Sequence, residues 1–221
     1  MLRGLFVTGT DTGVGKTIVC AALMHRYRTT IPLRYWKPIQ TGIERNDDTA
    51  EVERLGHCRP EELRRAGVRL PIPVSPHLAA SRQGVTIALA ALVDPIVDTG
   101  EPVRWIVEGA GGVLVPVNDS ETMADLMHLL RLPVIVVARS TLGTINHTLL
   151  TLEAVRRRTL HVAGIVMVGD RDADNRAAIE RYGETVVIGE MPRFSPLETR
   201  AVKAWAQTAL DPDDRLLELL R

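Results

Sequence analysis

Short runs of apolar residues alternate along the chain with longer stretches whose apolar positions recur at helical spacing. Several of the short runs are β-branched and apolar on both faces, which is typical of strands in a sheet that is covered on both sides. They predict strands over Leu2–Val7, Leu33–Trp36, Val103–Val107, Pro133–Val137, Val162–Met167 and Thr185–Ile188. The longer stretches predict helices over Thr17–Tyr27, Thr49–Leu55, Thr86–Val97, Thr122–Leu130, Thr144–Arg158 and Ala173–Tyr182, with a further helical stretch from about Pro196.

This alternation is the pattern of repeated βαβ units around a mostly parallel sheet with helices on both faces. We expect one α/β domain over residues 1–221, a length that suits a single compact unit. The segment Arg59–Ser81 does not fit the alternation, because it carries four prolines, Pro60, Pro71, Pro73 and Pro76. It is predicted to be a long surface loop.

The charges are balanced, with 27 basic and 27 acidic residues. A formal net charge of zero gives no electrostatic case for binding nucleic acid or an anionic membrane. No apolar run approaches the roughly 20 residues of a membrane span, and the N-terminus lacks the layout of a signal peptide. Cys20 and Cys58 lack metal-type spacing, and Cys20 lies in an apolar stretch as a small buried side chain. We therefore expect a cytoplasmic protein with no nucleic-acid or membrane partner.

The stretch from Gly9 to Thr17, with the sequence GTDTGVGKT, follows the first predicted strand and precedes the first predicted helix. Glycines let such a loop turn its N–H groups toward an anion, and the helix N-terminus adds its positive dipole end. Lys16 suits the terminal phosphates of a nucleotide, and the Thr17 hydroxyl suits Mg²⁺. Five residues separate Gly9 from Gly15, where the common P-loop pattern has four. The order of strand, loop and helix nevertheless predicts a P-loop NTPase-type fold and a nucleoside triphosphate ligand.

Ligands of open α/β sheets collect at the carboxyl ends of the strands, so the residues that follow other strands are candidates too. Glu108 directly follows an apolar strand and precedes Gly109-Ala110-Gly111-Gly112, which predicts a metal carboxylate opposite Thr17. Lys37 is either a second cation for the transferring phosphoryl group or a surface lysine. The adjacent Asp47 and Asp48 leave two interpretations open, because Asp48 can cap the following helix or hold a metal.

The motifs together resemble the dethiobiotin synthetase family over nearly the whole chain. The resemblance rests on the phosphate loop with its long gap, Lys37-Pro38 with Thr41-Gly42, Val107 to Gly112, Leu142 to His147, and Gly189 to Pro192. It implies closure of the ureido ring of dethiobiotin from 7,8-diaminopelargonate, CO₂ (or bicarbonate) and ATP. The implied intermediates are a carbamate and a carbamic–phosphoric anhydride, with ADP and phosphate as products.

The resemblance also implies roles for individual residues. Lys16 and Lys37 would be catalytic, and Thr17, Asp48 and Glu108 would hold Mg²⁺, which selects Asp48 over Asp47. The substrate would contact Thr12, Thr41, Gly143, Thr144 and Asn146, with its carboxylate tail at the helix start near Gly143 in a homodimer. The nucleotide would contact Gly13, Val14, Gly15, Lys16, Thr17, Ile18, Asp48, Glu108, Gly109, Ala110, Gly111, Val168, Gly169, Pro192, Arg193 and Phe194.

The chain departs from the family at Val168-Gly169, where members that select adenine often carry an Asn-Asp pair. An apolar residue and a glycine offer no side-chain amide to read a base, so we expect relaxed nucleotide choice.

Two rival functions share parts of this pattern. A partition-type ATPase has a similar loop, but its signature lysine would stand at the position of Asp11, before Thr12. A related amidoligase for a larger corrin-type substrate would need a glutaminase domain with a nucleophilic Cys, for which the chain is too short.

Overall fold

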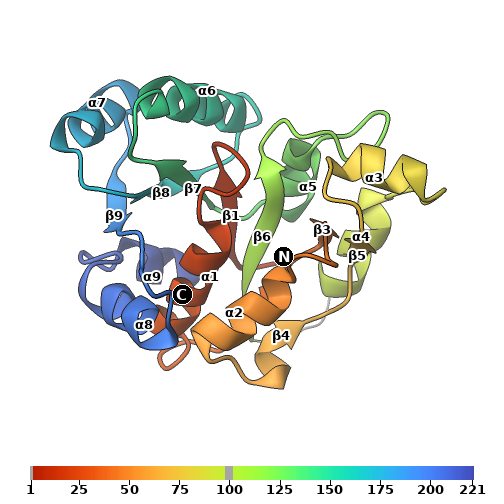
Figure 1. Ribbon diagram of the computed structural model, residues 1–221, viewed down its shortest axis with the longest axis horizontal. Coiled ribbons are helices and arrows are strands. Elements are labelled where there is room, and N and C mark those ends of the chain that lie inside the picture. Colours follow the sequence, from red (N-terminus) through yellow and green to blue (C-terminus); the bar gives the residue numbers. More distant parts are fainter. Residues whose placement is uncertain (1, 98–101) are drawn as a thin grey trace.

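The computed structural model describes residues 2–97 and 102–221. A parallel seven-stranded sheet runs through it in the order β4-β2-β6-β1-β7-β8-β9 (Figure 1). These strands are β1 (Gly4–Gly9), β2 (Leu33–Trp36), β4 (Leu63–Arg64), β6 (Arg104–Gly112), β7 (Val134–Arg139), β8 (Val162–Val168) and β9 (Val187–Met191). The predicted α/β class with a mostly parallel sheet is confirmed.

Helices cover both faces of this sheet, as expected (Figure 1). One face packs against α1 (Lys16–Tyr27), α2 (Asp48–Gly56), α8 (Thr199–Thr208) and α9 (Arg215–Leu220). The other packs against α4 (Leu89–Val97), α5 (Met123–Leu130), α6 (Thr144–Arg156) and α7 (Ala173–Gly183), whereas α3 (Pro76–Arg82) packs against the strands β3 (Ile39–Thr41) and β5 (Val68–Leu70). Successive residues of β1 serve opposite faces, since Phe6 belongs to one core cluster and Leu5 and Val7 to the other. Cys20 lies fully buried in α1, as predicted.

The position of β1 in the sheet fixes where ligands collect. In the sheet, β2 and β6 lie on one side of β1, and β7, the next strand of this sheet along the chain, lies on the other side. Loops that leave β1, β6 and β7 therefore diverge at the carboxyl end of β1, where an open α/β sheet forms its crevice. The loop that follows β1 is the predicted phosphate loop.

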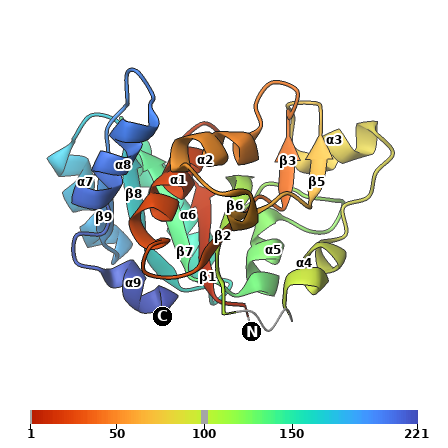
Figure 2. The same cartoon turned by 90° about the horizontal axis from the view of Figure 1, so that it is seen from below.

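The prediction of a long surface loop over Arg59–Ser81 is wrong. This segment holds a short 3₁₀ helix (Pro60–Glu62), the edge strand β4, the strand β5 (Val68–Leu70) and the first six residues of α3. Strand β5 pairs in parallel with β3 (Ile39–Thr41) in a small second sheet beside the main one (Figure 2). Pro60 and Pro76 occupy first helical turns, where the missing N–H costs nothing, so they start elements instead of preventing them.

Several predicted boundaries also move. Strand β6 continues four residues past Glu108 to Gly112, so Glu108 lies inside the strand and not directly after it. Strand β9 begins two residues later than expected, and α4 begins three residues later. The predicted C-terminal stretch forms α8 and α9 with a turn between them.

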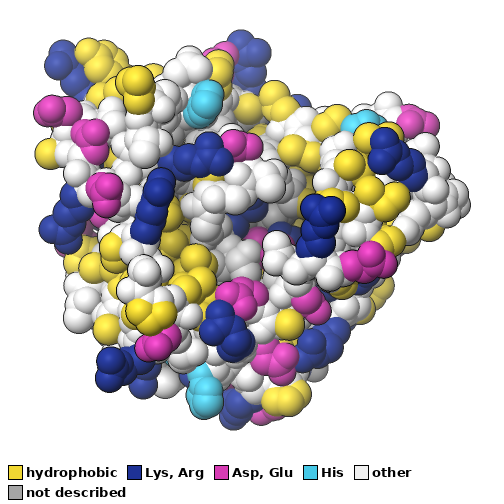
Figure 3. Space-filling view, viewed as in Figure 1, with side chains coloured by type: hydrophobic (Ala, Val, Ile, Leu, Met, Phe, Trp, Pro, Cys, Tyr) yellow, Lys and Arg dark blue, Asp and Glu magenta, His cyan; other side chains and the backbone are white. Residues whose placement is uncertain are grey.

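Basic and acidic side chains are intermixed over the face drawn in Figure 3, in keeping with the balanced composition. Within the described ranges, every helix is too short or too polar to cross a membrane.

Candidate active site

The phosphate loop joins β1 to α1 and ends in a left-handed turn. Gly13 and Gly15 have φ of 70° and 102°, values that favour glycine over residues with a Cβ. Gly15 caps α1 without a side chain, so the N–H groups of the first helical turn stay free for a ligand. An anion placed there would also meet the positive end of the helix dipole.

Lys16 is the first residue of α1, and its side chain folds back over the loop. It is buried, and its Nζ donates to the carbonyl of Asp11 at 3.0 Å. Burial, together with the nearby positive charge of Lys37, lowers its pKa from 10.5 to about 8. Among the described residues, this ammonium forms no ion pair with a carboxylate, so it is available to pair with an anionic ligand.

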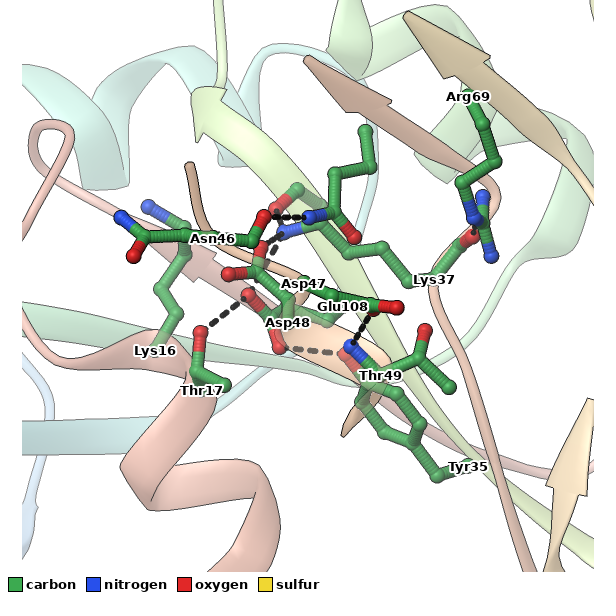
Figure 4. Close-up of polar contacts among 12 residues, drawn as sticks. Lys16, Thr17, Tyr35, Lys37, Asn46, Asp47, Asp48, Thr49, Arg69 and Glu108 are labelled. Carbon is green, nitrogen blue, oxygen red and sulfur yellow. Dashed lines mark hydrogen bonds and ion pairs between the residues drawn. The ribbon is translucent and has the colours of Figure 1, made fainter. Parts of the chain in front are cut away.

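Glu108 lies at the centre of a buried polar cluster beneath the loop (Figure 4). Its Oε1 accepts from Thr17 Oγ1 at 3.0 Å and from Lys37 Nζ at 2.7 Å, and its Oε2 accepts from Tyr35 at 2.8 Å. Strand β1 sets its place, because Glu108 is in register with Val7, two residues before the loop begins. The structure therefore brings the predicted Thr17, Lys37 and Glu108 together.

Lys37 follows β2 and is 4% exposed at its side chain, so the surface-lysine interpretation is wrong. Its Nζ lies 2.7 Å from both Glu108 Oε1 and Asp48 Oδ2, and it donates to the Gly109 carbonyl at 3.1 Å. Although burial opposes its charge, the two carboxylates raise the pKa of Lys37 above its ordinary value. This residue is a fixed cation between two anions.

The adjacent residues Asp47 and Asp48 make different contacts in the structure. Asp47 has extended backbone geometry and caps α2, with its side chain accepting from the N–H groups of Thr49 and Ala50. Asp48, the first helical residue, instead points its carboxylate at Lys37. The suggestion that Asp48 caps this helix is therefore wrong, and its carboxylate faces the cluster.

Thr17, Asp48 and Glu108 offer one hydroxyl and two carboxylates, which are the hard oxygen donors that Mg²⁺ prefers. Across residues 2–97 and 102–221, no three His, Cys, Asp or Glu side chains gather into a metal site made by protein alone. That suits Mg²⁺, which commonly takes one or two carboxylates and completes its shell with water and substrate phosphates. The donor set fits a nucleotide-bound magnesium ion.

A cavity of about 420 Å³ opens on the other side of the phosphate loop. Eight of its lining residues belong to the predicted nucleotide set: Gly13, Val14, Gly15, Ile18, Val168, Pro192, Arg193 and Phe194. Gly169 adjoins it, with its N–H donating to the Met191 carbonyl at 2.9 Å. Lys16, Thr17, Asp48 and Glu108 to Gly111 do not line this cavity. The predicted nucleotide residues are thus divided between this cavity and the polar cluster around Glu108, which lie on either side of the loop.

A second cavity, of about 580 Å³, lies between the loop, the end of β6 and one face of α6. Thr12 lines it, together with His147 and a largely apolar wall from Gly112 to Pro116. The other predicted substrate residues line neither cavity: Thr41 ends β3, Gly143 caps α6, Thr144 is buried and Asn146 is exposed. The five residues predicted to contact the substrate therefore do not line one common cavity.

The fold brings to the site two residues, Tyr35 and Arg139, that were not predicted to belong to it. Tyr35 reaches Glu108 from β2. Arg139 lines the first cavity from the end of β7, and its guanidinium lies 3.1 Å from Asp11 Oδ2. Arg139 stands at the end of a predicted strand, a position from which it could have been predicted to line the site. Nothing near Tyr35 in the sequence indicates that it contacts Glu108.

Comparisons with known proteins identify the family of the chain. The family model described as an AAA domain matches residues 3–201. The ATP-dependent dethiobiotin synthetase BioD of Paramagnetospirillum magneticum is 49% identical over 190 residues, covering 86% of this chain and 88% of that protein. The enzyme of the same name from Rhodopseudomonas palustris (strain CGA009) is 41% identical over 216 residues, with 98% of each chain covered.

Among solved structures, a ParA family ATPase from Chlorobium tepidum matches with a TM-score of 0.56 at 10% identity, covering 100% of this chain and 98% of that one. That distant likeness shows the P-loop NTPase fold alone. The much closer curated relatives decide against the partition-type ATPase as the family. The chain belongs to the dethiobiotin synthetase family, whose members are ATP-dependent ligases of biotin biosynthesis.

Proposed function

We propose that this chain closes the ureido ring of dethiobiotin from 7,8-diaminopelargonate, CO₂ and ATP, releasing ADP and phosphate. The observation that carries the proposal is Lys37, a buried cation beside the phosphate loop and 2.7 Å from both Asp48 and Glu108. A cation fixed there suits a reaction in which negative charge builds up on a carbamate and a transferring phosphoryl group.

Three steps account for the products. One substrate amine adds to CO₂ and loses a proton, which gives a carbamate. A carbamate oxygen then attacks the γ-phosphorus of ATP, ADP leaves, and a carbamic–phosphoric anhydride forms. The second amine attacks the carbonyl carbon, loses its proton and expels phosphate, which closes the ring. Positioning and charge neutralisation do most of the work in such a transfer.

The roles divide between the two lysines and the oxygen donors. Lys16 binds the terminal phosphates, and Lys37 faces the carbamate and the transferring group. Thr17, Asp48 and Glu108 hold Mg²⁺, which neutralises phosphate charge when bound. Because Lys37 lies between Asp48 and Glu108, it and the metal would share both carboxylates.

The remaining assignments follow from the family. Thr12 and Thr41 bind the diamine, and the substrate carboxylate lies at the N-terminus of α6 near Gly143, Thr144 and Asn146, in a homodimer. Gly143 caps this helix without a side chain, which leaves N–H donors for an anion. We also propose that residues 1–221 act as a single domain in the cytoplasm.

The composition of the nucleotide pocket leads to a prediction about base selectivity. Val168 lines the pocket with no side-chain amide, so we expect CTP and GTP to support turnover within a hundredfold of ATP, or about 2.7 kcal/mol. Turnover rates with each triphosphate at saturating diamine measure this. A preference for ATP of a hundredfold or more would contradict it.

Val168→Asn is the matched variant, because it adds an amide and is expected to increase the preference for ATP. Gly169 is unsuitable for such a change: its φ is 131°, and a Cβ there would lie 2.4 Å from Ser140 Oγ.

The proposed reaction is tested by product analysis. Purified chain, Mg²⁺, ATP, the diamine and isotopically labelled bicarbonate are incubated, and the product is identified by mass spectrometry. Dethiobiotin that carries the label in its ureido carbon supports the proposal. ATP hydrolysis without labelled product would overturn it.

A further inference from the structure

Tyr35 contacts the centre of the proposed metal site from within the core. It lies in β2, in register with Ile106 of β6, so its side chain shares a sheet face with Ile106 and Glu108. The ring is fully buried, and its hydroxyl donates to Glu108 Oε2 at 2.8 Å. A phenol thus reaches the carboxylate on the side away from the phosphate loop (Figure 4).

The two oxygens of Glu108 have different surroundings. Oε1 accepts from Thr17 and from Lys37, the residues that belong to the proposed site. Oε2 accepts from Tyr35, in the core. A carboxyl group that is 1% exposed needs hydrogen-bond partners to remain there, and the direction of those partners fixes which oxygen faces a ligand.

We propose that Tyr35 is a positioning residue: its hydroxyl holds Glu108 so that Oε1 faces Thr17 and the metal that accompanies the nucleotide. The proposal rests on the proposed function, because it concerns the same magnesium site. Partners that orient a metal ligand typically change metal affinity by about 10- to 100-fold when removed. We therefore expect Tyr35→Phe to lose about tenfold or more of the Mg²⁺-dependent part of nucleotide affinity.

The chain offers a matched control in Tyr27. This tyrosine of α1 is also buried, and its hydroxyl also donates to a carboxylate, Asp211 Oδ2. Asp211 accepts from the N–H groups at the start of α9 and takes no part in the proposed site. Tyr27→Phe thus reports what losing a buried tyrosine hydroxyl costs in stability alone.

The experiment is calorimetric titration of ADP into wild type, Tyr35→Phe and Tyr27→Phe, each with excess Mg²⁺ and with EDTA. Wild type and Tyr27→Phe are expected to bind ADP more tightly with Mg²⁺. In EDTA, Tyr35→Phe is expected to bind ADP as tightly as wild type and Tyr27→Phe do. With Mg²⁺, it is expected to lose most of the gain in ADP affinity that the other two chains show. Urea unfolding of each ligand-free variant accompanies the titrations and measures the folded fraction of Tyr35→Phe beside that of Tyr27→Phe, so that a loss of the Mg²⁺-dependent gain in affinity is assigned to folded chain only.

Two outcomes overturn the proposal in different ways. A Tyr35→Phe chain that keeps the full Mg²⁺-dependent gain in affinity would overturn the role of Tyr35 and leave the proposed function standing. A wild-type chain whose ADP affinity does not change with Mg²⁺ would overturn the magnesium site itself, and the role of Tyr35 with it.

Discussion

Lys37→Met is expected to lower the rate of diamine-dependent phosphate release by about a thousandfold or more. Cations that neutralise a transferring phosphoryl group are worth about 10³ to 10⁵ in rate in related chemistry. Methionine keeps the length and apolar stem of the lysine, so the change removes the charge with little change in volume. The measurement is kcat at saturating ATP and diamine, because the proposed role lies in the transition state.

The same change has a consequence for stability. Lys37 is the cation beside the buried Glu108, and removing one partner of a buried ion pair typically costs about 3–5 kcal/mol. Mg²⁺ with ADP would supply a replacement cation, so it is expected to raise the melting temperature of Lys37→Met more than that of wild type.

Lys203→Met is the matched control, because Lys203 is the third and last lysine of the chain and lies exposed on α8. It is expected to leave both rate and stability unchanged. Near-normal turnover by Lys37→Met, with Lys203→Met also normal, would refute the catalytic assignment.

Lys16→Met is expected to weaken ADP binding by about a hundredfold while leaving the ligand-free chain at least as stable as wild type. The loss of affinity follows because a buried ammonium beside the phosphates is worth about 3 kcal/mol as a charge-assisted donor. Titration of ADP by calorimetry and urea unfolding without ligand measure the two effects.

The stability effect follows from the pKa of Lys16, which falls from 10.5 to about 8 on folding, chiefly through burial. A base with a lowered pKa destabilises the folded chain wherever it is charged in both states, so the cost is complete below about pH 8. It is relieved as the pH rises from 8 toward 10.5, because the unfolded chain then binds more protons than the folded one. Unchanged ADP affinity, or marked destabilisation at pH 7, would contradict this account, with Lys203→Met as the reference.

The position of the phosphate loop could be predicted because its signals are local, whereas the residues around Lys37 left two interpretations open until the family resemblance selected one. The stretch from Gly9 to Thr17 follows a strand and leads into a helix in sequence order, while Lys37 only follows a recognisable apolar strand, a position that surface lysines also occupy. The alternation of strands and helices likewise fixed the fold class, since each long element carries its own periodicity.

The parts that sequence reasoning missed depend on contacts between distant segments. Strands β4 and β5 are two and three residues long, too short to show a period of two. Strand β6 continues through glycines because β1 pairs with it as far as Gly112, although glycine has little strand propensity. The choice between Asp47 and Asp48 as helix cap depends on the backbone at α2, and the Tyr35–Glu108 bond joins residues 73 positions apart.

The proposed reaction is tested most directly by phosphate release from the purified chain with Mg²⁺, ATP and bicarbonate, measured with and without 7,8-diaminopelargonate. Release is expected to depend on the diamine and to be lost in Lys37→Met. Release at the same rate without the diamine would contradict the proposed reaction, and would leave a nucleotide-hydrolysing protein whose buried Lys37 serves some other purpose.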